Sequence, residues 1–196
     1  MSGKRMLVVA TGNLNKLKEI AEIFPEYHVI SQKEAGFNEE AEENGKTFAE
    51  NAVIKAQTAC MALNLPIIAD DSGICVNVLG GEPGVYSARY AGEHGNDKAN
   101  RDLLLQNLKN ETDRTAYFES AIALVRPGAE PVVAIGKTYG HILLEEAGNG
   151  GFGYDCIFYS DDLKKSFGLA SPEEKNAVSH RYRALMSLRE KTGGEL

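Results

Sequence analysis

The chain has 196 residues, 43% of them apolar and 25% charged, which is the composition of an ordinary globular protein. Its 28 acidic residues outnumber its 21 basic residues, and the resulting formal charge of −7 argues against a surface that binds nucleic acid. No apolar run is long enough to cross a bilayer, and the run 6–10 is too short for a signal peptide. We therefore expect a cytoplasmic protein with no nucleic-acid or membrane partner.

Cysteine usage agrees with a reducing compartment. The chain has three cysteines, far apart and without a CxxC spacing: Cys60, Cys75 and Cys156. An odd number at such spacings predicts neither a disulfide framework nor a thiolate zinc site. We expect each thiol to be a small apolar side chain in or near the core.

The first elements along the chain are a strand, a turn and a helix. Residues 6–10 predict a buried strand, residues 11–13 a turn, and residues 14 to about 24 a helix with one apolar face. Such a turn presents backbone N–H groups at the positive end of the helix dipole, and Lys16 on the first helical turn can reach a phosphate oxygen. The GxxxxGK[ST] spacing of a Walker A loop is absent. A capped helix with a solvated lysine fits the same residues.

An acidic segment and a second helix follow. Residues 39–43 carry four glutamates, and a charged loop of this kind is usually only solvated. Thr47 and Glu50 form a capping box that opens a helix running to about Leu63.

Two adjacent carboxylates then leave a short apolar strand, 67–69. Burying Asp70 and Asp71 costs several kcal/mol unless each charge is paired, so we expect them to have a function. Side chains alternate along a strand, and the two carboxylates would then face opposite sides. We expect Asp71 to point into a site because Ser72 and Gly73 open a turn, and Asp70 to support it.

The remaining elements complete an α/β pattern with a mixed sheet. We expect a strand at 74–79, a helix at 98–108, an antiparallel pair at 115–125 and 132–144, a glycine-rich loop at 148–153, a strand at 156–159, a helical turn from 171 and a last helix ending near 191. No linker divides the chain, so residues 1–196 are expected to form a single domain, with two lobes possible inside it.

Two C-terminal segments can bind a planar base. Phe152 and Tyr154 lie between glycines and offer stacking surfaces, Asp155 offers acceptors, and His180 and Arg181 offer donors at a helix start. Core packing of the aromatic rings and a structural histidine are the alternatives for single residues.

A triphosphate beside these acidic residues needs a counter-charge. Like charges about 4 Å apart, at an effective dielectric near 20, repel by about 4 kcal/mol. A divalent cation bridging carboxylate and phosphate reverses that sign, and hard oxygen ligands favour Mg²⁺, with Mn²⁺ as a substitute. Part of the repulsion can also be offset by Lys16, Lys175 and Arg181.

Six segments in order resemble the Ham1/inosine-triphosphate pyrophosphatase family, the XTP/dITP diphosphatases. They are ATGNLNK at 10–16, EENGKTF…ENA at 42–52, IADDSG at 68–73, LGGEPGVYSARYAG at 79–92, GGFGYD at 150–155 and EKNAVSHR at 174–181. They cover nearly the whole chain. One departure is Cys156, where the family usually has proline, and we expect it to alter the start of the following strand without altering the reaction.

The resemblance implies a two-lobed Maf/Ham1-like α/β fold around a long mixed sheet with flanking helices, with the site in the interlobe cleft of a homodimer. It implies Mg²⁺-dependent hydrolysis of XTP, ITP and dITP to the monophosphate and pyrophosphate, which removes them from the nucleotide pool. The catalytic residues implied are Asp71 and Lys16, and the metal ligands are Asp71 and a glutamate, Glu42 placed before Glu43. The implied substrate contacts are Thr11, Gly12, Asn13, Leu14, Asn15, Lys16, Ser72, Phe152, Gly153, Tyr154, Asp155, Lys175, His180 and Arg181.

The expected mechanism places Lys16 and Asp71 in one pocket, joined by a divalent ion. Asp71, or a water it holds, would act as general base, while Lys16 would stabilise the departing pyrophosphate. Three other functions compete: a Maf-like pyrophosphatase with another base preference, a nucleotide sensor without turnover, and a nucleic-acid-binding protein. Carboxylates beside phosphate disfavour the sensor, and the net charge disfavours nucleic-acid binding.

Overall fold

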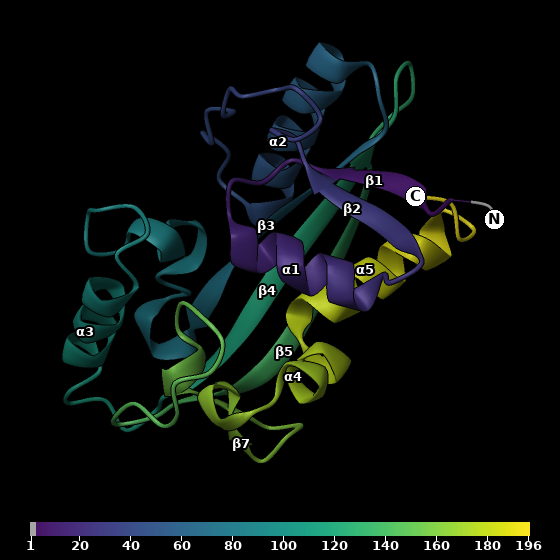
Figure 1. The fold of residues 1–196 in the computed structure, drawn as a ribbon. Coiled ribbons are helices and arrows are strands. Elements are labelled where there is room, and N and C mark those ends of the chain that lie inside the picture. The colour runs from purple at the N-terminus through teal and green to yellow at the C-terminus, as the bar shows by residue number, and fades with distance from the viewer. Residues whose placement is uncertain (1–2) are drawn as a thin grey trace. The chain divides into compact units, whose positions relative to one another are not determined.

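A seven-stranded sheet in the order β2-β1-β3-β4-β5-β6-β7 organises the chain, whose computed structural model describes residues 3–196 (Figure 1). β1 pairs in parallel with β2 and β3, whereas β5, β6 and β7 pair antiparallel. The strands are β1 Arg5–Val9, β2 Tyr27–Ser31, β3 Ile67–Val76, β4 Thr115–Val125, β5 Val132–Ile142, β6 Phe158–Ser160 and β7 Lys165–Ser166. The predicted α/β fold with a mixed sheet is therefore confirmed.

Four of the five helices of the described residues begin at a side-chain cap. They are α1 Leu14–Ile23, α2 Phe48–Leu63, α3 Asp97–Asn107, α4 Pro172–Val178 and α5 His180–Lys191, with 3₁₀ turns η1 Asn77–Leu79, η2 Gly84–Arg89, η3 Asp155–Ile157 and η4 Phe167–Leu169. Asn13 caps α1, and capping boxes open α2 and α4. In each case a side-chain oxygen accepts from a helix-start N–H that has no partner inside the helix. No helix in the described part of the chain is long and apolar enough to span a membrane.

Backbone contacts group the described residues into two compact units. The first comprises the chain up to Asp71, residues 120–136 and residues from Arg181 onward. Its core joins α1 and α5 to one face of the strands, through residues such as Ile20, Phe24 and Leu185. α2 lies on the opposite side of β3 (Figure 1). This helix presents alanines, fully buried, at positions 52, 56 and 59.

The second unit comprises residues 72–119 and 137–180. Its core packs Leu104 and Leu108 of the α3 region together with a group of aromatic rings. Phe118 lies edge-on to Phe158 at 4.8 Å and stacks with Phe167 at 6.2 Å between ring centroids. The single domain expected for residues 1–196 stays a prediction.

Two strand predictions differ from the structure by more than one or two residues at an end or in the type of element. β3 runs without a break from Ile67 to Val76, so the turn expected at Ser72 and Gly73 and the separate strand 74–79 are wrong. Nine of its ten residues are buried, and burial among neighbouring strands outweighs the local preference of a Ser-Gly pair for a turn. The strand expected at 156–159 begins only at Phe158, because residues 155–157 form η3.

Candidate active site

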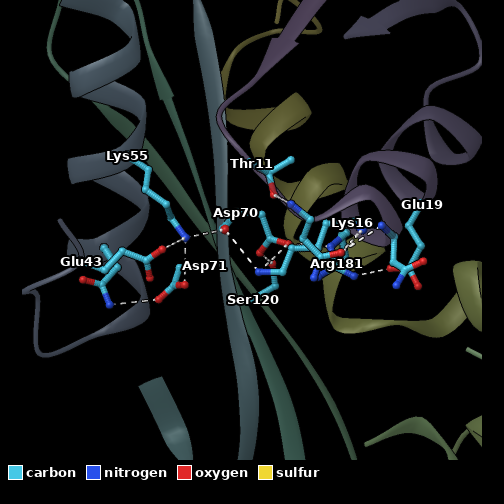
Figure 2. A network of polar contacts seen from close by, with 12 residues as sticks. Thr11, Lys16, Glu19, Glu43, Lys55, Asp70, Asp71, Ser120 and Arg181 are labelled. Atoms are coloured by element: carbon cyan, nitrogen blue, oxygen red, sulfur yellow. Dashed lines mark hydrogen bonds and ion pairs between the residues drawn. The ribbon is translucent and has the colours of Figure 1, made fainter. Parts of the chain in front are cut away.

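Unbroken extension of β3 sends its two carboxylates to opposite sides. Figure 2 shows Asp71 facing Lys55 of α2, while Asp70 faces Arg181, Ser120 and Lys16 on the other side of the strand. The predicted alternation is therefore confirmed, although the turn expected after Asp71 is absent. Two polar clusters result, one on each side of β3, and both lie in the first unit.

Lys55 joins Asp71 to the acidic segment before α2. Its Nζ donates to Asp71 Oδ1 at 3.0 Å and lies 3.3 Å from Glu43 Oε1. Asn51, one turn earlier on α2 and fully buried, donates through Nδ2 to Asp71 Oδ2 at 3.2 Å. The Asn51 Oδ1 accepts from the N–H of Gly45 at 2.8 Å, which holds the segment carrying Glu43 against α2.

Glu43 and Glu42 therefore differ in their surroundings. Glu43 is half-buried and paired with Lys55, whereas Glu42 is exposed. The sequence analysis placed Glu42 first, but the geometry brings Glu43 to Asp71.

Asp70 lies in a buried network of charges. Arg181 Nε donates to its Oδ2 at 2.6 Å, and Ser120 Oγ donates to its Oδ1 at 2.9 Å. Arg181 Nη1 also donates to Glu19 of α1. The Arg181 side chain is only 1% exposed, and its guanidinium joins α5 to Asp70 inside β3 and to Glu19 of α1.

Two lysines meet at the backbone between the carboxylates. Lys16 Nζ donates to the Asp70 carbonyl oxygen at 3.5 Å, and Lys55 Nζ donates to the same oxygen at 3.0 Å. The two ammonium groups are thus no more than about 6.5 Å apart, the sum of those distances. The direct acidic partner of Lys16 is Asp70 at 3.7 Å, so its expected link with Asp71 is indirect and runs through this shared oxygen.

Burial and charge move the pKa values of these groups in opposite directions. Burial raises the pKa of Asp71 above its ordinary value, and Lys55 and Lys16 only partly counter it. Burial also acts to raise the pKa of Asp70, but Arg181 and Lys16 hold it well below its usual range. The pKa of Lys16 is lowered chiefly by burial. Burial acts to lower the pKa of Lys55 too, but Asp71 and Glu43 outweigh it and raise that pKa.

The carboxylates near Lys55 suit a hard cation. Asp71 and Glu43 converge on one position that already holds a positive charge, and their oxygens are the ligand type that Mg²⁺ prefers. Within residues 3–196 no group of three or more His, Cys, Asp or Glu side chains is placed to hold a metal ion. These residues fit a magnesium ion with two protein carboxylates and remaining ligands from water or phosphate, rather than a dedicated protein cage.

The predicted phosphate segment, residues 11–16, forms the turn before α1. Asn13 Oδ1 accepts from the N–H groups of Asn15 and Lys16 at 2.9 and 3.2 Å, and the Thr11 hydroxyl accepts from the Asn13 N–H at 3.0 Å. Two of the amides expected to face an anion therefore serve the helix cap. The Glu40 carboxylate lies close to Gly12, because a Cβ at this position would be only 2.9 Å from Glu40 Oε1. Leu14 is exposed.

Most predicted base-contact residues gather in the second unit. Lys175 Nζ bonds Asp155 Oδ2 at 2.5 Å and lies 4.6 Å from the centre of the Phe152 ring. Asp155 Oδ2 also accepts from the Phe152 N–H at 2.8 Å, so one carboxylate orients both groups. The Lys175 and Asp155 side chains are 5% and 3% exposed.

The other predicted base contacts have different surroundings. Tyr154 is a buried core residue whose hydroxyl donates to the Ser87 carbonyl oxygen at 2.8 Å, as its core-packing alternative requires. His180 is buried and stacks on Phe118 at 4.8 Å. Arg181 belongs to the first unit, in the Asp70 network, whereas half-buried Ser72 follows Asp71 in β3 within the second unit.

Sequence reasoning missed Lys55 and Asn51. Both lie four residues apart inside the apolar helix α2, so they share one helical face. Two polar residues at that spacing on the buried side of a helix are a signal that was available in the sequence.

The comparisons with known proteins agree on one family. A model of the Ham1 family matches residues 7–191. A dITP/XTP pyrophosphatase of Clostridium perfringens is 45% identical, over 98% of this chain and 99% of that protein, and one of Bacillus cereus is 46% identical over 97% and 96%. The solved structure of the Staphylococcus aureus Ham1 protein is 44% identical and covers 98% of this chain and all of that chain, with a TM-score of 0.86.

These features define an α/β protein with lysines and carboxylates clustered around the middle of one strand. The chain belongs to the Ham1 family.

Proposed function

We propose that this chain is a nucleoside-triphosphate pyrophosphatase that hydrolyses XTP, ITP and dITP to the nucleoside monophosphate and pyrophosphate, with Mg²⁺. Relatives that match nearly its full length carry the name dITP/XTP pyrophosphatase. The observation that carries the proposal is the meeting of two ammonium groups and two carboxylates around the Asp70–Asp71 peptide. Such a cluster can bind a polyphosphate and still present a base to water.

The lysines supply charge to the phosphates. Lys16 and Lys55 both donate to the Asp70 carbonyl oxygen. An anion bound beside that oxygen would therefore contact both ammonium groups. Positively charged donors preorganised in this way stabilise the charge that develops on a departing pyrophosphate. Arg181 and Ser120 anchor Asp70, and this fixes the backbone on which both lysines converge.

Asp71 is the candidate general base. Burial raises its pKa in the metal-free protein, and with Mg²⁺ bound the base would be Asp71 or a water that it holds. Asn51 and Lys55 hold both of its oxygens and orient it.

Asp71 and Glu43 would hold the magnesium ion, and the ion supplies Lewis-acid polarisation of a phosphoryl oxygen when bound. The pairing of Glu43, and not Glu42, with Lys55 supports Glu43 as the second ligand.

The cluster of Phe152, Asp155 and Lys175 is the candidate base site. Inosine and xanthosine present a 6-oxo acceptor and an N1–H donor, and adenosine presents the reverse pattern. Against adenine, Lys175 would face an amino donor instead of the O6 acceptor, and a hydrogen-bond mismatch in a buried site can reduce turnover by about 10⁴-fold. An acceptor such as Asp155 complements N1–H.

We also propose a homodimer that works in the cytoplasm, where the nucleotide pool is. Light scattering coupled to gel filtration measures the oligomeric state. We expect a mass near 43 kDa, about twice the 21.3 kDa of one chain.

The deciding experiment is turnover of ITP, XTP, dITP, GTP and ATP with Mg²⁺ and after its removal by EDTA. Products are scored as monophosphate plus pyrophosphate against diphosphate plus phosphate. We expect pyrophosphate from the first three only, and only with Mg²⁺. Release of orthophosphate, or a preference for pyrimidine nucleotides in an extended panel, would reject the proposal in favour of another phosphatase or a Maf-like enzyme.

Two substitutions test the residue roles in the same assay. Asp71→Asn keeps the size of the side chain and is expected to abolish turnover while the far-UV circular dichroism stays that of the wild type. Glu43→Gln is expected to raise the Mg²⁺ concentration needed for half-maximal rate at least about tenfold, since loss of even an outer-shell partner costs about 10- to 100-fold in metal affinity, and Glu42→Gln to change it little. The reverse order would assign the metal to Glu42.

A further inference from the structure

Helix α3 holds both peptide groups of a single glycine. The N–H of Gly153 donates to Asp97 Oδ2 at 2.9 Å, and Arg101 Nη1 donates to the Gly153 carbonyl oxygen at 2.8 Å. Asp97 and Arg101 are four residues apart, so they lie on one face of the helix. One helical face therefore supplies an acceptor and a donor to the same residue.

Arg101 also holds the other end of the glycine-rich loop. Its Nε donates to Glu146 Oε1 at 2.7 Å, and its side chain is only 16% exposed. A planar guanidinium presents its donors in a fixed fork, so these two bonds set the distance between Glu146 and Gly153. The loop 146–153 is thus held at both ends by one side chain.

Hydrogen bonds from both sides hold the backbone of Gly153. Gly153 has a positive φ of 59°, and a Cβ built on it would meet no heavy atom within 4 Å. The peptide between Phe152 and Gly153 is held on both sides, because the Phe152 carbonyl oxygen accepts from the Asp155 N–H at 3.1 Å while the Gly153 N–H donates to Asp97. Removing Asp97 therefore leaves this peptide with one of its two hydrogen bonds.

The residues beside Gly153 form the candidate base site. Phe152 precedes it, and the Phe152 ring lies under Lys175 at 4.6 Å. A rotation of the peptide at Gly153 would move this ring relative to Asp155, which binds both the Phe152 N–H and Lys175. The charge of Asp97 is itself stabilised by its place in the first turn of α3.

We propose that Asp97 and Arg101 are positioning residues for base recognition, which act through Gly153 to set the Phe152 ring against the base. The inference rests on the proposed function, because it assigns these residues to its base site. We call the two hydrogen bonds from Asp97 and Arg101 to Gly153 the clamp. Loss of the clamp is predicted to weaken binding of the base-bearing substrate and to leave the phosphate site and the chemical step unchanged.

The test compares Asp97→Ala, Asp97→Asn and Asp102→Ala. Asparagine keeps an oxygen acceptor for the Gly153 N–H. Asp102→Ala removes the exposed Lys98–Asp102 pair of the same helix and is the matched control. The readouts are kcat and KM for ITP, inhibition by inorganic tripolyphosphate, which has no base, the calorimetric Kd of inosine monophosphate, and the melting temperature.

Asp97→Ala is expected to raise the KM for ITP and the Kd of inosine monophosphate about tenfold, the scale of one charge-assisted hydrogen bond. Its kcat and its inhibition by tripolyphosphate are expected to stay within about twofold of the wild type. Asp97→Asn should recover most of the loss, and Asp102→Ala should behave as the wild type. If Asp97→Ala does not fold, Arg101→Gln carries the same test, because it frees the Gly153 carbonyl and leaves the Asp97 bond.

An unchanged KM and Kd in Asp97→Ala would overturn the inference, as would an equal loss of tripolyphosphate inhibition, which marks a general structural role. A wild type that binds inosine monophosphate but releases no pyrophosphate rejects the proposed function alone, and the Kd series then still decides on the clamp. A wild type that neither turns over ITP nor binds inosine monophosphate overturns both.

Discussion

Replacing Arg181 by methionine removes the central cation of a buried network, while the methionine side chain fills most of the space that the arginine stem occupied. Arg181 is 1% exposed, its partner Asp70 carboxylate is fully buried, and Glu19 is 11% exposed. In the variant two carboxylates lose their main donor, with Ser120 and Lys16 left to serve Asp70.

The cost follows from the unpaired charge. Removing one partner of a buried ion pair destabilises a protein by about 3 to 5 kcal/mol. In a chain of this size each kcal/mol lowers the melting temperature by about 2 to 4 °C, so a fall of roughly 6 to 20 °C is expected. Arg189→Met is the matched control on the same helix, because the Arg189–Glu26 pair is about half exposed and such pairs contribute about 1 kcal/mol or less.

The assay is urea unfolding followed by far-UV circular dichroism, since the chain has no tryptophan for fluorescence. EDTA in the buffer keeps metal binding out of the measured free energy of unfolding. The prediction concerns the difference in that free energy between Arg181→Met and the wild type at pH 7.

The pH dependence gives a second check on the same variant. The folded pKa of Asp70 is depressed in the wild type, so its contribution to stability is present above the unfolded pKa of about 3.9 and is lost as pH falls toward the folded pKa. Without Arg181 the folded pKa of Asp70 is expected to rise, because burial, the largest effect on it, is then countered mainly by Lys16 and Lys55. In the variant, the cost of the buried charge disappears once Asp70 is protonated in both the folded and the unfolded state, below about pH 4. The difference in free energy of unfolding between the two proteins is therefore expected to narrow there.

A loss below about 1 kcal/mol at pH 7, equal to that of Arg189→Met, would refute this reasoning. It would mean that water or a moved side chain compensates the two carboxylates. A gap that widens on acidification would show that Asp70 is not the group left uncompensated.

Other substitutions test the local structure. Thr47→Ala removes the acceptor for the Glu50 N–H in the capping box of α2, and thermal unfolding should show a loss of about 1 kcal/mol; no loss would show that the cap is dispensable. Gly151→Ala places a Cβ 2.1 Å from Asp155 Oδ2 at a φ of +70°, and should lower the melting temperature well beyond Gly128→Ala, whose Cβ meets nothing within 4 Å. Burial raises the pKa of the thiols of Cys60, Cys75 and Cys156, so in the native protein all three should react slowly with a disulfide reagent at pH 7.5. All three should react fully in guanidinium, and a thiol that reacts fast in the native protein would contradict this prediction.

Local signals located most elements within a few residues. Apolar periodicity and side-chain caps are short-range properties. The starts of α1 and α2 follow from Asn13 and from the Thr47–Glu50 capping box. The alternation of Asp70 and Asp71 followed from strand geometry alone. β2 and β7 were not predicted, because a strand of few residues is set by its pairing with neighbours.

The sequence by itself determined the α/β class, the family motifs and the placement of two carboxylates on opposite sides of one strand. Only the tertiary structure decided that Lys55 joins Asp71 to Glu43, that Arg181 is paired with Asp70 and Glu19, and that α3 holds Gly153. Arg181 and Asp70 are 111 residues apart in sequence. The partner of a buried charge is chosen by which distant elements pack together, and no window of sequence contains that information.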